Sequence, residues 1–242
     1  MSMNQPDATA NRTIDIAWDE SGTPIATRFD DPYYSRMDGR METQHVFLGL
    51  NDLPRRWATK AEFTIAELGF GTGLNFLETL ATWRTTEKAN TARLTYVSFE
   101  RFPMTSDDLA RAISRWPELR DDCAHLLAHW PPPDGFSEIN FGDDAALHLT
   151  IGDANMMVPA WQGMADAWFL DGFSPAKNPE MWGEALMHAV CDHTEAGGTF
   201  ATFTAAGWVR RNLQVAGFDV SKAPGYGHKR ECLLGRKAEP FT

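Results

Sequence analysis

The sequence predicts an α/β fold with a mostly parallel sheet, and two observations support this prediction. Short apolar runs that are typical of buried strands alternate along the chain with stretches in which apolar residues recur at helical spacing. The last two predicted strands are separated only by the turn Pro224-Gly-Tyr-Gly227, which is too short for a parallel crossover. We therefore expect helices on both faces of the sheet and an antiparallel strand at its C-terminal end.

Seven strands are predicted in this sheet. A separate N-terminal β-hairpin is expected before them, from residues 13–18 and 24–29 around Glu20-Ser21-Gly22. The loop that starts at Trp130 with three prolines is expected to lead into a second hairpin, whose second arm is the third strand of the sheet. The seven strands are expected at residues 63–68, 94–99, 146–151, 167–170, 198–204, 218–223 and 231–235.

Helices are predicted between these strands. The first carries Leu74, Leu77, Leu80 and Ala81 at helical spacing, and the second starts near Ser106. A third is expected to begin with Asn178 as its N-cap and Pro179 in its first turn, and to carry Trp182, Leu186 and Val190. The last is expected over residues 208–216, with Gly217 as its stop.

The length of 242 residues suits one α/β domain with some surplus for insertions. Residues 1–12 are polar and predict a disordered N-terminus rather than a signal peptide. Residues 13–242 are expected to form a single domain, with the N-terminal hairpin inside about 13–50. No stretch approaches about 18 apolar residues, so no membrane span is expected. Three scattered cysteines without a CxxC pair favour the reducing cytoplasm.

The charge of the chain is strongly uneven. A net charge of −11 disfavours a nucleic-acid binder when the chain is taken as a whole. From Ala205 onward, however, seven basic residues face three acidic ones, so this segment is locally positive. A solvated surface is the simpler interpretation of this tail, and contacts to phosphates are the alternative.

A glycine-rich loop follows the first strand of the sheet. Gly69, Gly71 and Gly73 allow a sharp turn and the close approach of a ligand. A dinucleotide-binding loop has the pattern G-x-G-x-x-G, but Leu74 stands where its third glycine belongs. Glu67 would also sit poorly beside a pyrophosphate, whereas it suits the cationic amino group of a methionine moiety. A tight turn without a ligand is the alternative interpretation.

Two further acidic residues end the next two strands. Glu100 follows the second strand, where a carboxylate can accept both ribose hydroxyls, and Asp153 follows the third, where it can meet an adenine amino group. Taken alone, each is more often a turn residue at the end of a strand. Together with Glu67 they line the crevice in which open α/β sheets bind ligands. The set predicts a site for S-adenosylmethionine in a Rossmann-like class I methyltransferase fold.

Asp171 is the candidate for catalysis. It ends the fourth strand of the sheet, within the sequence Leu170-Asp-Gly-Phe-Ser-Pro175. Methyl transfer depends mainly on holding donor and acceptor in line, and an amine acceptor must first lose a proton. A carboxylate can orient such an amine and take that proton. An Asp turn or helix cap at the same position is an equally good structural explanation.

Other features are weaker indications of a site. His125 and His129 stand four residues apart, but their sequence lacks the glutamate of a metalloprotease, so no metal is expected. Tyr33 and Tyr34 are expected either to cover the pocket or to pack against its wall. The nine tryptophans are expected mainly in the core.

With these residues in place, the chain closely resembles the methyltransferase domain of the MnmC family of bifunctional tRNA-modification enzymes. The resemblance runs from about Phe29 to Cys232, and its most specific stretch is LDGFSPAKNPEMW. The other matching stretches are RFDDPYYS, ETQHVFLG, ELGFGTGLNF, SFERFP, TFTAAGWVRRNLQVAGF and GYGHKREC.

The resemblance implies N-methylation of 5-aminomethyl-(2-thio)uridine at the tRNA wobble position, with Asp171 as the base. The sequence ends at Thr242, so it resembles the stand-alone MnmD-type form, without the FAD-dependent oxidoreductase domain. Its substrate is then expected from a separate oxidoreductase or another source, and neither FAD nor a metal is expected as its own cofactor. The remaining alternatives are a methyltransferase for another amine, a non-enzymatic nucleotide-binding module and, least favoured, a dehydrogenase.

The expected contacts fall into two groups. The cofactor is expected to contact Glu67, Gly69, Phe70, Gly71, Thr72, Gly73, Asn75, Glu100, Asp153 and Asp171. The tRNA is expected to contact Tyr33, Phe173, Lys177, Arg210, Arg211, Lys229 and Arg230, of which the basic clusters are candidates for phosphate contacts.

Overall fold

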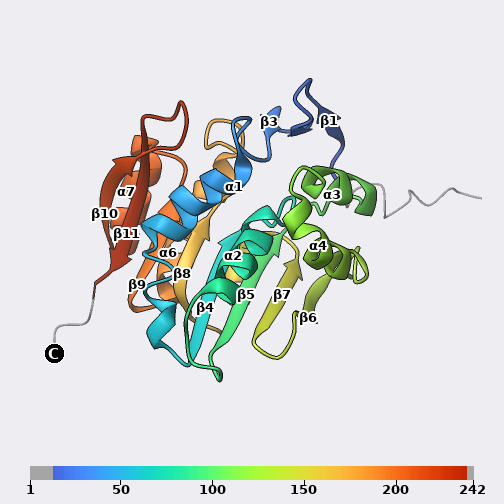
Figure 1. Cartoon of the computed structure of the whole chain (residues 1–242). Coiled ribbons are helices and arrows are strands. Elements are labelled where there is room, and N and C mark those ends of the chain that lie inside the picture. Colours follow the sequence, from blue (N-terminus) through green and yellow to red (C-terminus); the bar gives the residue numbers. More distant parts are fainter. Residues whose placement is uncertain (1–12, 239–242) are drawn as a thin grey trace, which may run out of the picture.

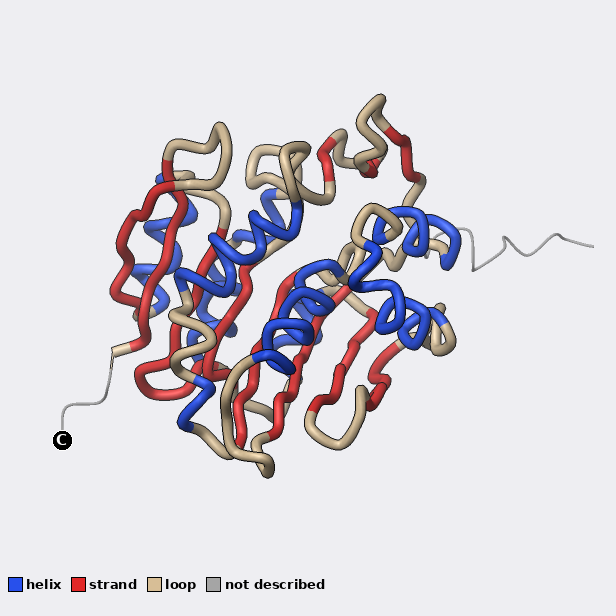
Figure 2. The backbone as a smooth tube through the Cα atoms, viewed as in Figure 1, coloured by secondary structure: helices blue, strands red, loops and turns tan. Residues whose placement is uncertain are grey.

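The computed structural model describes residues 13–238, and a mixed sheet of eight strands forms its centre. The strand order is β10-β11-β9-β8-β4-β5-β7-β6, and helices cover both faces (Figures 1 and 2). The predicted α/β fold is therefore confirmed, including helices on both faces of the sheet. The predicted disordered segment, residues 1–12, lies outside the described residues.

Five neighbouring strands of the sheet pair in parallel, and three strands at its two edges pair antiparallel with their neighbours. The parallel strands are β4 (Glu62–Leu68), β5 (Arg93–Glu100), β7 (Ala145–Ile151), β8 (Ala165–Leu170) and β9 (Thr194–Thr202). The strands that pair antiparallel are β6 (Gly135–Asn140), β10 (Phe218–Pro224) and β11 (Glu231–Lys237). Of these, β6 and β11 run opposite to the five parallel strands, and β10 runs in their direction. The predicted antiparallel C-terminal hairpin is confirmed. The sheet has one strand more than predicted, because β6, the first arm of the hairpin expected before β7, joins its edge.

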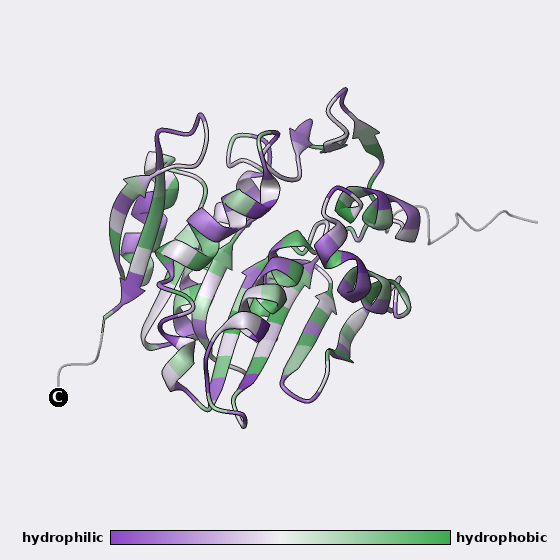
Figure 3. Cartoon of the chain, viewed as in Figure 1, coloured by the Kyte–Doolittle hydropathy of each residue, from purple (hydrophilic) through white to green (hydrophobic). Residues whose placement is uncertain are grey.

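Two hydrophobic layers hold the sheet. Apolar residues run along the central strands, and every residue of β8 is buried (Figure 3). One layer contains residues of α2 (Leu74–Thr85), α3 (Ser106–Ile113) and α4 (Arg120–Leu127). The other contains residues of α5 (Ala154–Ala160), α6 (Glu184–Asp192) and α7 (Gly207–Ala216). Short 3₁₀ turns occur at Trp57–Thr59, Pro117–Leu119 and Pro179–Trp182.

The prediction of a helix that starts at Asn178 is wrong about where the helix begins. Residues Pro179–Trp182 form a 3₁₀ turn, and α6 begins only at Glu184. Gly183 has extended backbone angles between them, and Asn178 makes no side-chain capping hydrogen bond. Trp182 explains the break, because its buried indole donates a hydrogen bond to the Phe173 carbonyl (3.0 Å) and so fixes the turn against the loop after β8.

A helical segment that was not predicted from the sequence lies beside α2, on the same face of the sheet (Figure 1). It consists of α1 (Gly39–Glu42), which continues into a π-helical stretch, Thr43–Gly49. Asp38 caps it by accepting hydrogen bonds from the backbone of Arg40 and Met41. Its buried residues Gly39, Glu42, Thr43, Val46 and Phe47 recur at helical spacing. Because Glu42 and Thr43 are polar, this spacing does not appear as a hydrophobic pattern in the sequence.

The N-terminal hairpin is confirmed but gains a third strand. β1 (Ile16–Trp18) and β2 (Pro24–Ala26) pair antiparallel, and β2 also pairs with β3 (Asp31–Pro32). The carboxylate of Asp31 accepts a hydrogen bond from the backbone N–H of Ser174 (2.7 Å). This contact ties the small sheet to the loop after β8. Within residues 13–238, no helix is both long and apolar enough to cross a membrane.

Candidate functional site

The glycine loop between β4 and α2 occupies the carboxyl edge of the sheet. Gly69, Gly71 and Gly73 all have positive φ angles, of 82°, 54° and 73°. A Cβ atom on Gly69 would lie 3.4 Å from the Cα of Gly172, and one on Gly71 would lie 3.1 Å from the ring of Tyr33. The positive φ angles and the closeness of neighbouring protein atoms therefore both favour glycine at positions 69 and 71.

Two adjoining cavities open at this loop. The larger has a volume of about 370 Å³ and the smaller about 220 Å³. They share part of their walls, namely Gly69, Glu100, Phe102, Gly172 and Phe173. Together they form an elongated site in the range that small-molecule ligands and cofactors occupy.

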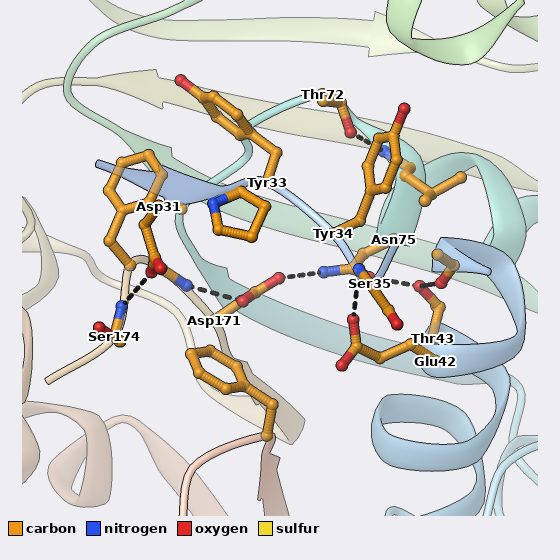
Figure 4. Close-up of a pocket in the computed structure, with 18 of the residues that line it drawn as sticks. Asp31, Tyr33, Tyr34, Ser35, Glu42, Thr43, Thr72, Asn75, Asp171 and Ser174 are labelled. Carbon is orange, nitrogen blue, oxygen red and sulfur yellow. Dashed lines mark hydrogen bonds between the residues drawn. The ribbon is translucent and has the colours of Figure 1, made fainter. Parts of the chain in front are cut away.

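A hydrogen-bonded network joins the ends of β4 and β8 at the larger cavity, and Figure 4 shows the part of it formed by Asn75 and Asp171. The side-chain amide of Asn75 donates to Glu67 (3.0 Å) and to Asp171 (2.8 Å). Glu67 also accepts a hydrogen bond from the hydroxyl of Ser98 (2.7 Å), and Asp171 from the backbone of Gly172 (2.8 Å). Asp171 and Asn75 line the cavity, whereas Glu67 is fully buried behind them. Glu67 is therefore hydrogen-bonded to the cavity wall through Asn75.

The pKa values of both carboxyl groups in this network, Asp171 and Glu67, are raised. Burial, with a smaller contribution from the charge of Glu42, raises the pKa of Asp171 to about 7, although hydrogen bonds from Gly172 and Asn75 partly oppose the shift. Burial also raises the pKa of Glu67 well above its usual value, with a further contribution from Asp171. Near neutral pH, Asp171 can therefore both hold and release a proton.

Glu100 forms the wall between the two cavities. Its carboxylate accepts hydrogen bonds from the backbone N–H groups of Gly71 (2.9 Å) and Phe102 (2.6 Å). Burial raises its pKa, and these backbone donors oppose the shift. An ionised carboxylate has about four acceptor positions, so acceptor capacity remains for a ligand hydroxyl.

Asp153 lies in the wall of the smaller cavity. It is the N-cap of α5, and its carboxylate accepts hydrogen bonds from the backbone of Asn155 (3.0 Å) and from Arg101 (2.8 Å). The structural explanation considered for this residue, a turn or cap after a strand, thus holds in the structure. Asp153 thus both caps α5 and lines the smaller cavity.

Aromatic residues of the N-terminal segment pack against Phe173, which lies in the walls of both cavities. The ring of Phe173 stacks on Phe29 at a centroid distance of 4.4 Å and meets Tyr33 edge-on at 5.1 Å. Burial raises the pKa of Tyr33, as do the nearby carboxylates led by Glu100, so its hydroxyl stays protonated. Lys177 forms ion pairs with Asp30 and Asp31 at 3.1 and 3.7 Å. These contacts hold the N-terminal sheet against the loop that carries Asp171.

The predicted basic residues lie in two separate places. Lys229, in the turn between β10 and β11, lines the larger cavity and pairs with Glu42 at 2.7 Å. Arg230 follows it and is exposed. Arg210 and Arg211 lie in α7, which contacts α6 and β10, and neither lines one of the two cavities.

The structure brings together most of the predicted contact residues. Ten of them line the larger cavity: Tyr33, Gly69, Phe70, Gly71, Thr72, Asn75, Glu100, Asp171, Phe173 and Lys229. Two more, Asp153 and Lys177, line only the smaller cavity. Five predicted residues, Glu67, Gly73, Arg210, Arg211 and Arg230, line neither. The sequence analysis missed Glu42 and Thr43, because the helix that carries them was not predicted. Nowhere in residues 13–238 is there a group of three or more His, Cys, Asp or Glu that could hold a metal ion.

Comparisons with known proteins agree with this arrangement. A family model described as S-adenosyl-L-methionine-dependent methyltransferase matches residues 117–238. The chain is 46% identical over 235 residues to the tRNA 5-methylaminomethyl-2-thiouridine biosynthesis bifunctional protein MnmC of Pseudoalteromonas atlantica, covering 93% of this chain and 33% of that protein. It is 44% identical to the protein of the same name from Stutzerimonas stutzeri, covering 96% of this chain and 36% of that protein. The chain thus spans about a third of the length of these relatives.

Among solved structures, the crystal structure of MNMC2 from Aquifex aeolicus has the same fold. It aligns with a TM-score of 0.73 over 95% of this chain and 73% of that chain, at 24% sequence identity. Its alignment includes nearly the whole chain and so supports the assignment of the fold.

The raised pKa of Asp171 predicts a specific dependence of stability on pH. The unfolded carboxyl group ionises near pH 4, whereas the folded one ionises near pH 7. The stability that protonated Asp171 contributes is therefore fully present below about pH 4 and is lost as the pH rises through about 7. The neutral variant Asp171→Asn should gain stability relative to the wild type by up to about 1.4 kcal/mol per pH unit across this window.

Urea unfolding of both proteins from pH 4 to pH 8 measures this difference. The other titrating groups are common to both proteins, so their contributions largely cancel. A difference that stays constant over the whole range would show that the Asp171 carboxyl group has an ordinary pKa.

Proposed function

Because this chain belongs to the family of S-adenosyl-L-methionine-dependent methyltransferases, we propose that it N-methylates the aminomethyl group of 5-aminomethyl-(2-thio)uridine at the tRNA wobble position. The product is the 5-methylaminomethyl form. The observation that carries the proposal is the position of Asp171, a carboxyl group at the end of β8 that lines the larger cavity and is oriented by Asn75. A buried carboxyl group with a pKa near 7 is suited to take a proton from an amine.

The residues around both cavities fit S-adenosylmethionine. We propose that its methionine end lies along the glycine loop beside Asn75, that Glu100 accepts its ribose hydroxyls, and that its adenine enters the smaller cavity beside Asp153. The acceptor positions left on Glu100 and the glycines at 69 and 71 support this placement. When bound, the cofactor supplies an electrophilic methyl carbon on a positively charged sulfur. Glu67 acts in this proposal as a positioning residue, because only Asn75 separates it from the ligand.

The name of the relatives and the charges at the rim support tRNA as the substrate. Both curated relatives are named for 5-methylaminomethyl-2-thiouridine biosynthesis in tRNA. In this chain, Lys229 lies at the cavity and Arg230 next to it, where they can contact phosphates near the modified base. We propose that Tyr33 and Phe173 contact the base itself and that Lys177, Arg210 and Arg211 add contacts further away. The reaction is then expected in the cytoplasm, where tRNA is found.

The proposed chemistry begins with a proton transfer. A free primary amine is protonated in neutral water and has no lone pair for attack. Asp171, once ionised, accepts one proton from this ammonium group, and the nitrogen then attacks the methyl carbon in line with the leaving sulfur. Because methylation does not oxidise or reduce the uridine, this step calls for no flavin. The aminomethyl group itself must come from an earlier reaction, which we assign to a separate oxidoreductase or another source.

We also propose that residues 13–242 act as one domain. The small N-terminal sheet supports this, because Asp31 and Lys177 connect it to the loop that carries Asp171. Part of the wall of the larger cavity, from Asp31 to Met37, comes from this N-terminal segment.

The function is tested by transfer of a labelled methyl group from S-adenosylmethionine to tRNA that carries the unmethylated aminomethyl group. We expect label in 5-methylaminomethyl-(2-thio)uridine upon nucleoside analysis. Asp171→Asn should slow single-turnover transfer by about 10²–10⁴-fold, the range for a lost acid or base, and should lower cofactor affinity far less. Label in a different nucleoside, or in protein or small amines only, would overturn the substrate assignment. A near-normal rate for the variant would mean that Asp171 is structural.

The basic clusters are tested by the salt dependence of tRNA binding. Each lost phosphate contact lowers the slope of log affinity against log salt by roughly 0.7–0.9. The double variant Arg210→Glu/Arg211→Glu and the single variant Arg230→Glu should each weaken binding and flatten this slope, with unchanged cofactor affinity. Arg55→Glu is the matched control, because this exposed residue precedes the amino end of β4 at the opposite edge of the sheet. If a cluster variant behaves like Arg55→Glu, that cluster does not bind the tRNA.

A further inference from the structure

A second carboxylate, Glu42 of α1, faces the cavity that Asp171 lines. Its side chain is almost completely buried, with 10% of its surface exposed. One oxygen accepts a hydrogen bond from Lys229 (2.7 Å) and the other from the backbone of Ser35 (2.9 Å). A carboxylate has about four acceptor positions, so two remain for a group that enters the cavity.

The positions of Glu42 and Asp171 are fixed by a common set of hydrogen bonds (Figure 4). Thr43, which follows Glu42, donates from its hydroxyl to the side-chain oxygen of Asn75 (2.6 Å). The amide group of Asn75 in turn donates to Asp171 (2.8 Å). The negative charge of Glu42 contributes to the raised pKa of Asp171, in agreement with their closeness. The two carboxyl groups thus belong to one preorganised arrangement around the same cavity.

A primary amine that attacks a methyl group needs acceptors for two N–H groups. After loss of one proton, the nitrogen carries two hydrogens and one lone pair. The lone pair must point at the methyl carbon, so both hydrogens point elsewhere. Two fixed acceptors hold this orientation better than one, because a single acceptor leaves the amine free to rotate.

Building on the proposed function, we infer that Glu42 is this second acceptor and limits the reaction to one methyl group. Asp171 takes a proton from the ammonium group, and Asp171 and Glu42 then each receive one N–H. The nitrogen gives its lone pair to the methyl carbon as the carbon–sulfur bond breaks, and the sulfur keeps the electrons of that bond. The product is a secondary ammonium, which leaves with the tRNA.

A second transfer would require the new methyl group to take the place of an N–H. The methyl group cannot donate a hydrogen bond, so an acceptor position that faces the cavity on one of the two buried carboxyl groups would lose its donor and meet an apolar group instead. Sites built to bind an N–H reject analogues that lack it by about 10⁴–10⁵-fold, whereas a pocket that only measures size discriminates by about 10–200-fold. Glu42 therefore favours the primary over the secondary amine.

The test compares Glu42→Ala with Glu42→Asp, using tRNA that carries either the aminomethyl or the methylaminomethyl group. Wild type should methylate only the first of these. Glu42→Ala should raise the rate of the second methylation relative to the first by about 100-fold or more, with dimethylated nucleoside detected by mass spectrometry. Glu42→Asp withdraws the carboxylate by one methylene, so it should release part of this restriction even if Glu42→Ala does not fold. Without cofactor, equilibrium binding should favour the primary-amine tRNA in wild type, and both variants should reduce this preference.

Lys229→Met is the matched control for a purely structural role of Glu42. It removes the same ion pair and should weaken tRNA binding, but its product should remain monomethylated. If Lys229→Met gives as much dimethylated product as Glu42→Ala, or if folded Glu42 variants keep the wild-type amine preference, the inference is overturned. If the wild type does not methylate aminomethyl tRNA at all, it is the proposed function that fails.

Discussion

The side-chain amide of Asn75 is the constraint around which the site is arranged. Its two N–H groups go to the carboxyl groups of Glu67 and Asp171, at the ends of the neighbouring strands β4 and β8, and its oxygen accepts from Thr43. Burial and mutual repulsion disfavour ionisation of two neighbouring carboxyl groups, and the N–H donors of Asn75 between them partly offset this effect. One amide therefore links the π-helical stretch Thr43–Gly49, α2 and two strand ends, and it fixes the direction in which Asp171 faces the cavity.

The charges around this amide suit a cationic ligand. The wall of the larger cavity carries four acidic residues, Asp31, Glu42, Glu100 and Asp171, and Lys229 already pairs with one of them. An acidic wall attracts the sulfonium and ammonium groups of the methyl donor and also a protonated amine. It repels RNA phosphates, so a polynucleotide substrate depends on basic residues at the rim. The sequence shows the same separation of charge, because the net charge is strongly negative whereas the C-terminal segment is positive.

The sequence was sufficient to predict the parts of the fold that have a strong local pattern. Buried strands with an acid at the carboxyl end are recognisable from their residues alone, so Glu100, Asp153 and Asp171 could be assigned to one edge of the sheet. The sequence could not show that Asn75, at the start of α2, reaches back between Glu67 and the cavity. It also could not predict α1, because the polar residues that this helical segment buries, Glu42 and Thr43, face a site that exists only in the folded chain.

Proton release on cofactor binding tests the central claim most directly, namely that Asp171 is a buried acid poised to ionise beside a cationic donor. A positive charge near Asp171 lowers its pKa, so binding near pH 7 should release a proton. Calorimetric titration of S-adenosylmethionine in buffers with different ionisation enthalpies measures this release. We predict heats that depend on the buffer for wild type and that depend on it much less for Asp171→Asn. Equal heats for wild type in all buffers would contradict the account.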